Sequence, residues 1–141
     1  PDAAVPDDLF RAVVQVLAAW GWARRPGAVV AVASRHRPQL VASLARRIAE
    51  VGRLPFLGEL PRTPGHPGGP AGETNSVQRL AAVHGAFTLP DELARAVAGL
   101  GAPVLLVDDV IASGWTVTVA ARLLRQAGAE AVLPFALAVD G

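Results

Sequence analysis

One stretch near the carboxyl end constrains the fold more than any other: Val-Leu-Leu-Val-Asp-Asp-Val-Ile-Ala-Ser-Gly-Trp-Thr, at positions 104–116. The four consecutive apolar residues 104–107 are typical of a parallel strand that is buried on both faces. Two carboxylates, Asp108 and Asp109, follow where this strand is expected to end. Small residues come next, and an apolar pattern with the period of a helix begins at about Trp115. This order predicts a strand, a loop and a helix of an α/β protein.

The residue types in this stretch predict a site for a sugar phosphate. Gly114 has no Cβ, so the backbone can approach a ligand there, and the free amides that open the next helix favour an anion. Ser113 and Thr116 add hydroxyl donors, whereas Asp108 and Asp109 only accept hydrogen bonds, which suits the two hydroxyls of a ribose. The loop expected to hold the phosphate consists of Ala112, Ser113, Gly114, Trp115 and Thr116. An acid pair at a strand end also occurs in α/β proteins without such a site, so this alternative stays open.

The same stretch resembles the signature of the type I phosphoribosyltransferases, in which a four-residue apolar run precedes two acids, two apolar residues and a Thr-Thr-Gly-x-Thr loop. Asp108, Asp109, Gly114 and Thr116 match that pattern, and Ser113 is a conservative substitute. Ala112 departs from it because it has no hydroxyl. The resemblance implies Asp108 and Asp109 as ribose ligands, the loop 112–116 as phosphate ligand, and Mg²⁺ that arrives with 5-phosphoribosyl 1-diphosphate near the two acids, without a metal site made by the protein alone.

Apolar periodicity along the chain predicts strands that alternate with helices. We expect strands at 28–33, 54–60, 104–107 and 131–139, with a short extended piece at 85–89. Helices are expected at 7–20, 38–51, 75–83, 90–99 and 115–127, the last of them ending at Gly128. Such alternation predicts a doubly wound, mainly parallel sheet of about four to five strands flanked by helices.

Composition indicates one domain that spans residues 1–141. Hydrophobic residues make up 52% and charged residues 18%, and the net charge is +1 with arginine as its only strong base. Without Cys or Lys the chain has neither thiolate metal ligands nor a Schiff-base lysine. Apolar runs are too short for a membrane span, and a cytoplasmic location is expected. Because no Met is present, we interpret the chain as a fragment of a longer protein.

Two further segments gain a role from the resemblance. In phosphoribosyltransferases the loop after the first core strand contacts pyrophosphate, which here implies Ser34, Arg35 and Arg37; the two arginines are equally compatible with solvated loop charges. Residues 61–74 hold four prolines and four glycines, which predicts a flexible loop. Its position corresponds to the family's flexible substrate loop, but a linker explains it equally well.

Finer resemblances point to two kinds of protein. The runs 33–41 and 120–129, together with Asp108–Asp109 and Gly114–Thr116, resemble the carboxyl-terminal phosphoribosyltransferase-like domain of RecQ-type ATP-dependent DNA helicases of GC-rich bacteria. This implies an upstream ATP-binding helicase in DNA repair or recombination, through which DNA would be bound. The run 79–87 resembles the competence-related ComF phosphoribosyltransferases, with Ala82 where that family has Asn.

Two functions therefore remain open. In the first, the chain is an accessory domain that binds a ribose 5-phosphate ligand and catalyses no transfer. In the second, it is an active, Mg-dependent phosphoribosyltransferase of the ComF or nucleobase-salvage type. We favour the first, because the chain has little sequence from which to build a hood over an acceptor base.

Overall fold

The computed structural model describes residues 2–34, 37–61, 87–111 and 115–139. The elements follow one another in the order α1 (Asp7–Ala19), β1 (Ala28–Val32), α2 (Pro38–Gly52), β2 (Phe56–Leu60), α4 (Asp91–Ala98), β3 (Val104–Ile111), α5 (Trp115–Gln126) and β4 (Val132–Val139). The expected helix at 75–83 and all but the first residue of the expected loop at 61–74 lie outside the described residues. Residues 85 and 86 of the expected extended piece at 85–89 also lie outside them, and Phe87 forms a single bridge.

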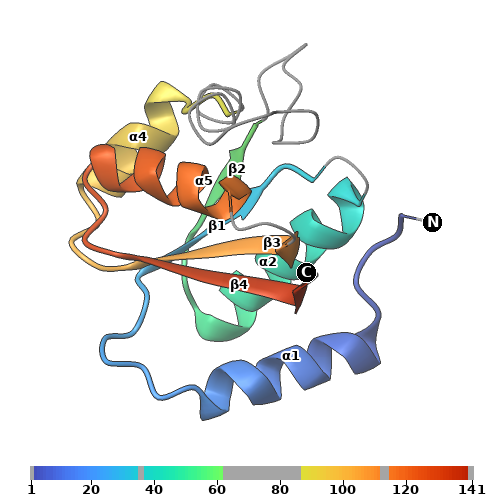
Figure 1. Cartoon of the computed structure of the whole chain (residues 1–141). Coiled ribbons are helices and arrows are strands. Elements are labelled where there is room, and N and C mark those ends of the chain that lie inside the picture. The colour runs from blue at the N-terminus through green and yellow to red at the C-terminus, as the bar shows by residue number, and fades with distance from the viewer. Residues whose placement is uncertain (1, 35–36, 62–86, 112–114, 140–141) are drawn as a thin grey trace.

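The four strands form one parallel sheet in the order β2-β1-β3-β4 (Figure 1). The predicted α/β fold with a doubly wound parallel sheet is confirmed. Helices α4 and α5 cover one face, where Leu93, Val97 and Leu124 pack against alternate strand residues such as Val30 and Leu106. Helices α1 and α2 cover the other face. The two inner strands β1 and β3 are therefore buried on both sides, as their continuous apolar runs predict.

Strand β3 is longer than the sequence predicts. The apolar run stops at Val107, yet the strand continues through Asp108 and Asp109 to Ile111. Its backbone stays paired with β4 over this length, with Asp108 opposite Ala136 and Ile111 opposite Val139. Backbone hydrogen bonds do not depend on apolar side chains, so the acids lie within the strand and not after it.

Gly58 and Gly128 occupy backbone conformations that other residues rarely adopt. Gly58 in β2 has φ 122°, next to the point where the pairing with β1 skips one residue. Gly128 follows α5 with φ 118°, and a Cβ added there would lie 3.1 Å from the Cα of Ala98 in α4. Gly128 is thus the helix stop that the sequence predicts, and it also permits the turn after α5 to approach the end of α4 closely.

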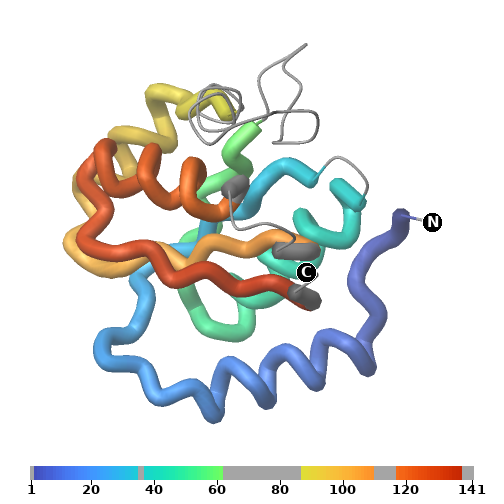
Figure 2. Tube along the Cα trace, viewed as in Figure 1, coloured from blue at the N-terminus to red at the C-terminus, as the bar shows by residue number. Residues whose placement is uncertain are grey.

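The amino-terminal arm runs along α2 before α1 begins (Figure 2). The Asp2 carboxylate accepts hydrogen bonds from the backbone amides of Gln39 (2.9 Å) and Leu40 (3.1 Å). These are two of the amides that open α2, whose own N-cap, Arg37, makes no side-chain cap. Asp2 therefore caps a helix that begins 36 positions later in the sequence.

Arg47 of α2 contacts the amino-terminal arm and the start of α1. Its Nη1 lies 3.1 Å from Oδ1 of Asp7 and donates to the carbonyl of Val5 at 3.3 Å. Its guanidinium carbon lies 4.2 Å from the centre of the Phe10 ring, within cation–π range. Together with the buried side chains of Phe10 and Val13, these contacts position α1 across the sheet.

Candidate functional site

Strands β1 and β3 are neighbours in the sheet, so their carboxyl ends lie side by side. Ser34 follows β1, and its hydroxyl donates a hydrogen bond of 3.1 Å to Oδ2 of Asp109 in β3. The same hydroxyl accepts the backbone N–H of Arg37 at 3.0 Å. The structure thus brings together three of the residues that the sequence singles out, from two segments 75 positions apart.

The two acids differ in their surroundings. Successive side chains of a strand point to opposite faces, so Asp108 follows Leu106 toward α4 and α5 while Asp109 follows Val107 toward α2. Asp108 is only 4% exposed, and its Oδ1 accepts the backbone N–H of Asp109 at 2.8 Å. Asp109 is half-buried. The more accessible carboxylate at this edge of the sheet is therefore Asp109.

The loop predicted to bind the phosphate, residues 112–116, follows β3 in the sequence and includes the first two residues of α5. Ala112, Ser113 and Gly114 lie outside the described residues. Helix α5 begins at Trp115, as the sequence predicts, so its amino end follows directly on the strand that carries the acids. A helix amino end concentrates free backbone amides and positive dipole charge, which favours an anion.

The pyrophosphate candidates are only partly described. Ser34 lies beside Asp109, Arg37 is exposed at the start of α2, and Arg35 lies outside the described residues. No local pattern marks Asp2 as a residue near this loop, yet its carboxylate accepts hydrogen bonds from two amides at the start of α2. Those two amides therefore already have an acceptor, whereas the side chain of Arg37 is exposed.

The described residues contain neither a metal-binding cluster nor a membrane-spanning helix. No three His, Asp or Glu side chains in this part of the chain gather into a group that could hold a metal ion. None of the described helices combines the length and the apolar character that crossing a membrane requires.

Comparisons with known proteins find likeness in structure alone. No family model and no curated protein matches the sequence. Among solved structures, the chain is similar to a purine phosphoribosyltransferase from Pyrococcus horikoshii Ot3, with a TM-score of 0.56 and 17% identity over 94% of this chain and 71% of that one. It is similar to an adenine phosphoribosyltransferase with a TM-score of 0.56 and 18% identity, over 94% of this chain and 66% of the other.

A third similar structure is the adenine phosphoribosyltransferase from Thermoanaerobacter pseudethanolicus ATCC 33223, with a TM-score of 0.51 and 14% identity over 92% of this chain and 80% of that one. The chain thus spans between about two thirds and four fifths of the length of these proteins. Likeness at this level of identity concerns the fold. The four-stranded parallel sheet with helices on both faces is the fold of the type I phosphoribosyltransferases.

Proposed function

We propose that the carboxyl ends of β1 and β3 bind the ribose 5-phosphate moiety of a ligand such as 5-phosphoribosyl 1-diphosphate. The observation that carries this proposal is the 3.1 Å hydrogen bond from Ser34 to Asp109. It places the loop after β1 and the acid of β3 next to each other, at the edge of a parallel sheet where ligands characteristically bind.

The two acids have separate roles in this proposal. Asp109, which is half-buried, accepts hydrogen bonds from the ribose hydroxyls. Asp108 is buried, and it accepts a hydrogen bond from the backbone amide of Asp109, which holds that part of the strand in position. It contacts the ribose where the ligand covers the end of β3. Both carboxylates have oxygen atoms that are good acceptors for a diol, and neither donates a hydrogen bond when ionised.

The phosphate groups occupy the two loops. The 5-phosphate binds residues 112–116, where the amino end of α5 contributes its dipole and its first amides. The pyrophosphate group binds Ser34, Arg35 and Arg37, since a guanidinium grips phosphate oxygens in pairs. The exposed side chain of Arg37 supports this assignment.

Mg²⁺ would enter with the ligand. Its preferred ligands are carboxylate and phosphate oxygens together with water, and the Asp109 carboxylate is of that type. The residues present therefore fit a metal ion that is held mainly by phosphates. When bound, Mg²⁺ would neutralise part of the charge of the pyrophosphate group.

Calorimetric titration tests the binding directly. The parent protein is titrated with 5-phosphoribosyl 1-diphosphate in the presence of Mg²⁺, beside variants Asp109→Asn and Asp91→Asn. Asp91 is an exposed acid on α4 and serves as the matched control. We expect Asp109→Asn to weaken binding by about tenfold or more, because a charge-assisted hydrogen bond contributes roughly 1.5–3 kcal/mol. Absence of saturable heat in the parent overturns the proposal.

A second candidate is catalytic transfer of the phosphoribosyl group to a purine, which the likeness to purine and adenine phosphoribosyltransferases favours. A ring nitrogen of the base forms a bond to C1 of the ribose, the bond from C1 to the pyrophosphate oxygen breaks, and the base loses a proton. Pyrophosphate release with adenine, guanine or hypoxanthine distinguishes the two candidates. Turnover that disappears in Asp109→Asn supports catalysis, whereas binding without turnover supports the accessory domain.

Attachment to a DNA helicase remains a prediction from sequence resemblance. Neither the structure nor the comparisons link the chain to a helicase or to DNA. The intact open reading frame tests this prediction, because an upstream helicase motor would be evident in it.

A further inference from the structure

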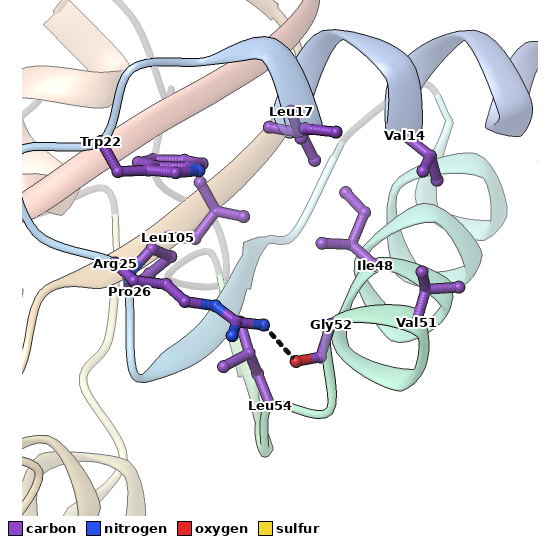
Figure 3. A pocket seen from close by; sticks show the side chains of 11 residues that line it. Val14, Leu17, Trp22, Arg25, Pro26, Ile48, Val51, Gly52, Leu54 and Leu105 are labelled. Atoms are coloured by element: carbon purple, nitrogen blue, oxygen red, sulfur yellow. Dashed lines mark hydrogen bonds between the residues drawn. The ribbon is translucent and has the colours of Figure 1, made fainter.

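A cavity of about 280 Å³ lies between α1, α2 and the sheet (Figure 3). Its wall comes from α1, α2, the segment between α1 and β1 and the starts of the strands, and it includes Trp22, Arg25 and Ile48. Pro26, Leu54 and Leu105 stand before or near the start of β1, β2 and β3. The cavity therefore opens at the amino ends of the strands, at the opposite end of the sheet from Ser34 and Asp109.

The cavity has an apolar floor and a charged rim. Ile48 and Leu105 are buried beneath it, and Trp22 forms one wall with its indole ring. Val51 is 57% exposed and Arg25 is exposed, so both lie where the cavity meets solvent. Among the described residues that line the cavity, Arg25 alone is charged. A ligand that matches this arrangement has an apolar body and one negative charge.

The Arg25 guanidinium is held in place yet keeps donors for a ligand. One of its nitrogens, Nη2, donates to the carbonyl of Gly52 at 2.7 Å (Figure 3). No acidic side chain in the described part of the chain forms an ion pair with Arg25. A guanidinium carries five N–H donors, so several remain to grip a carboxylate.

The volume limits the size of the apolar body. An apolar protein cavity of about 150 Å³ is sufficient to bind benzene. The cavity beside Trp22 has nearly twice that volume, which suits a two-ring aromatic or a branched aliphatic group of similar size.

We propose that this cavity binds a small aromatic or branched aliphatic carboxylate, with its apolar body against Trp22 and Ile48 and its carboxylate on Arg25. The site is separate from the ribose phosphate site and does not depend on it. It provides a second ligand position at the amino ends of the strands.

The probe for this proposal is 2-naphthoate, and its neutral isostere 2-naphthamide is the matched control ligand. Calorimetric titration of the whole chain is expected to show one naphthoate bound per chain. The amide is expected to bind about tenfold more weakly or worse, because it lacks the charge that Arg25 complements. No saturable binding of naphthoate at millimolar concentration overturns the proposal, and so does equal affinity for the two probes.

Two pairs of variants locate the probe. Ala18 lines the cavity, so the indole of Ala18→Trp is expected to occupy it and abolish naphthoate binding. Ala12 lies on the same helix but outside the lining, and Ala12→Trp is expected to leave naphthoate binding unchanged. Arg25→Gln is expected to reduce the affinity for naphthoate to that for the amide, and Arg11→Gln to leave it unchanged. Naphthoate that binds Arg25→Gln as tightly as the parent refutes the assigned site, even if Ala18→Trp fails to fold.

Discussion

Substitution of Ser34 by alanine is the most informative single change at the edge of the sheet. It removes the hydroxyl that donates to Oδ2 of Asp109 at 3.1 Å and accepts the N–H of Arg37 at 3.0 Å. Ser34 thereby loses its hydrogen bond to Asp109 in β3. We expect Ser34→Ala both to lower the free energy of unfolding and to weaken binding of 5-phosphoribosyl 1-diphosphate.

The size of the stability loss follows from the two hydrogen bonds. A hydrogen bond to an ionised group contributes roughly 1.5–3 kcal/mol and a neutral one about 1 kcal/mol. Ser34 is half-buried and the Arg37 amide is exposed, so water replaces part of what is lost. A net loss of about 2 kcal/mol remains, which corresponds to a fall in Tm of roughly 6 °C for a chain of this size.

Thermal and urea unfolding measure this loss, and Ser43→Ala is the matched control. The Ser43 hydroxyl also makes two hydrogen bonds, from the amide of Val5 at 2.8 Å and to the carbonyl of Leu40 at 3.1 Å, but none to a carboxylate. We expect Ser43→Ala to cost about 1 kcal/mol and to leave ligand affinity unchanged. If Ser34→Ala is as stable as the parent protein, or binds the ligand equally well, the role given to this hydroxyl is wrong.

Three further substitutions test the packing of the fold by urea unfolding. Gly128→Ala is expected to cost more than about 1 kcal/mol, because φ is 118° and the new Cβ would lie 3.1 Å from the Cα of Ala98; an unchanged midpoint would contradict this. Asp2→Ala is expected to cost about 1 kcal/mol through loss of the cap on α2, and Asp2→Asn less, since one acceptor oxygen remains. Glu130→Gln breaks the exposed ion pair with Arg24 and is expected to change stability by less than about 1 kcal/mol; a larger loss would show that this pair is not screened by solvent.

Local pattern was sufficient to predict most of the sheet and its helices. Buried parallel strands require continuous apolar runs such as 28–33, and the helices are predicted by apolar spacing and by stops such as Gly128. The expected bounds of α1, α2 and α5 agree with the structure to within one residue at each end. The carboxyl ends of β1 and β3 could likewise be predicted to meet, since alternating strands and helices imply a parallel sheet.

Features that depend on distant residues could not be predicted in this way. The strand β3 continues past Val107 because its backbone pairs with β4, which the apolar pattern does not reveal. Asp2 caps α2 across 37 positions, and no local motif marks that contact. The cavity beside Trp22 arises from the way α1 lies across α2 and the sheet, so only the assembled structure contains it.

The difference in burial between Asp108 and Asp109 also depends on the assembled structure. From the sequence alone, both are predicted as equivalent carboxylates that face one diol. Strand alternation and burial distinguish them, because Asp108 is buried and Asp109 is half-buried beside Ser34. We therefore expect Asp109→Asn to weaken ligand binding more directly, and Asp108→Asn to lower stability as well.

Mapping of backbone amide chemical shifts by NMR tests the location of the ligand most directly. On addition of 5-phosphoribosyl 1-diphosphate with Mg²⁺, the account predicts the largest shifts at Ser34, Arg37, Asp109 and the first residues of α5. The amides of Trp22 and Arg25, at the other end of the sheet, are predicted to move little. Shifts that concentrate at Trp22 and Arg25, or the absence of shifts at Ser34 and Asp109 at saturating ligand, would contradict the assignment of the ribose phosphate site.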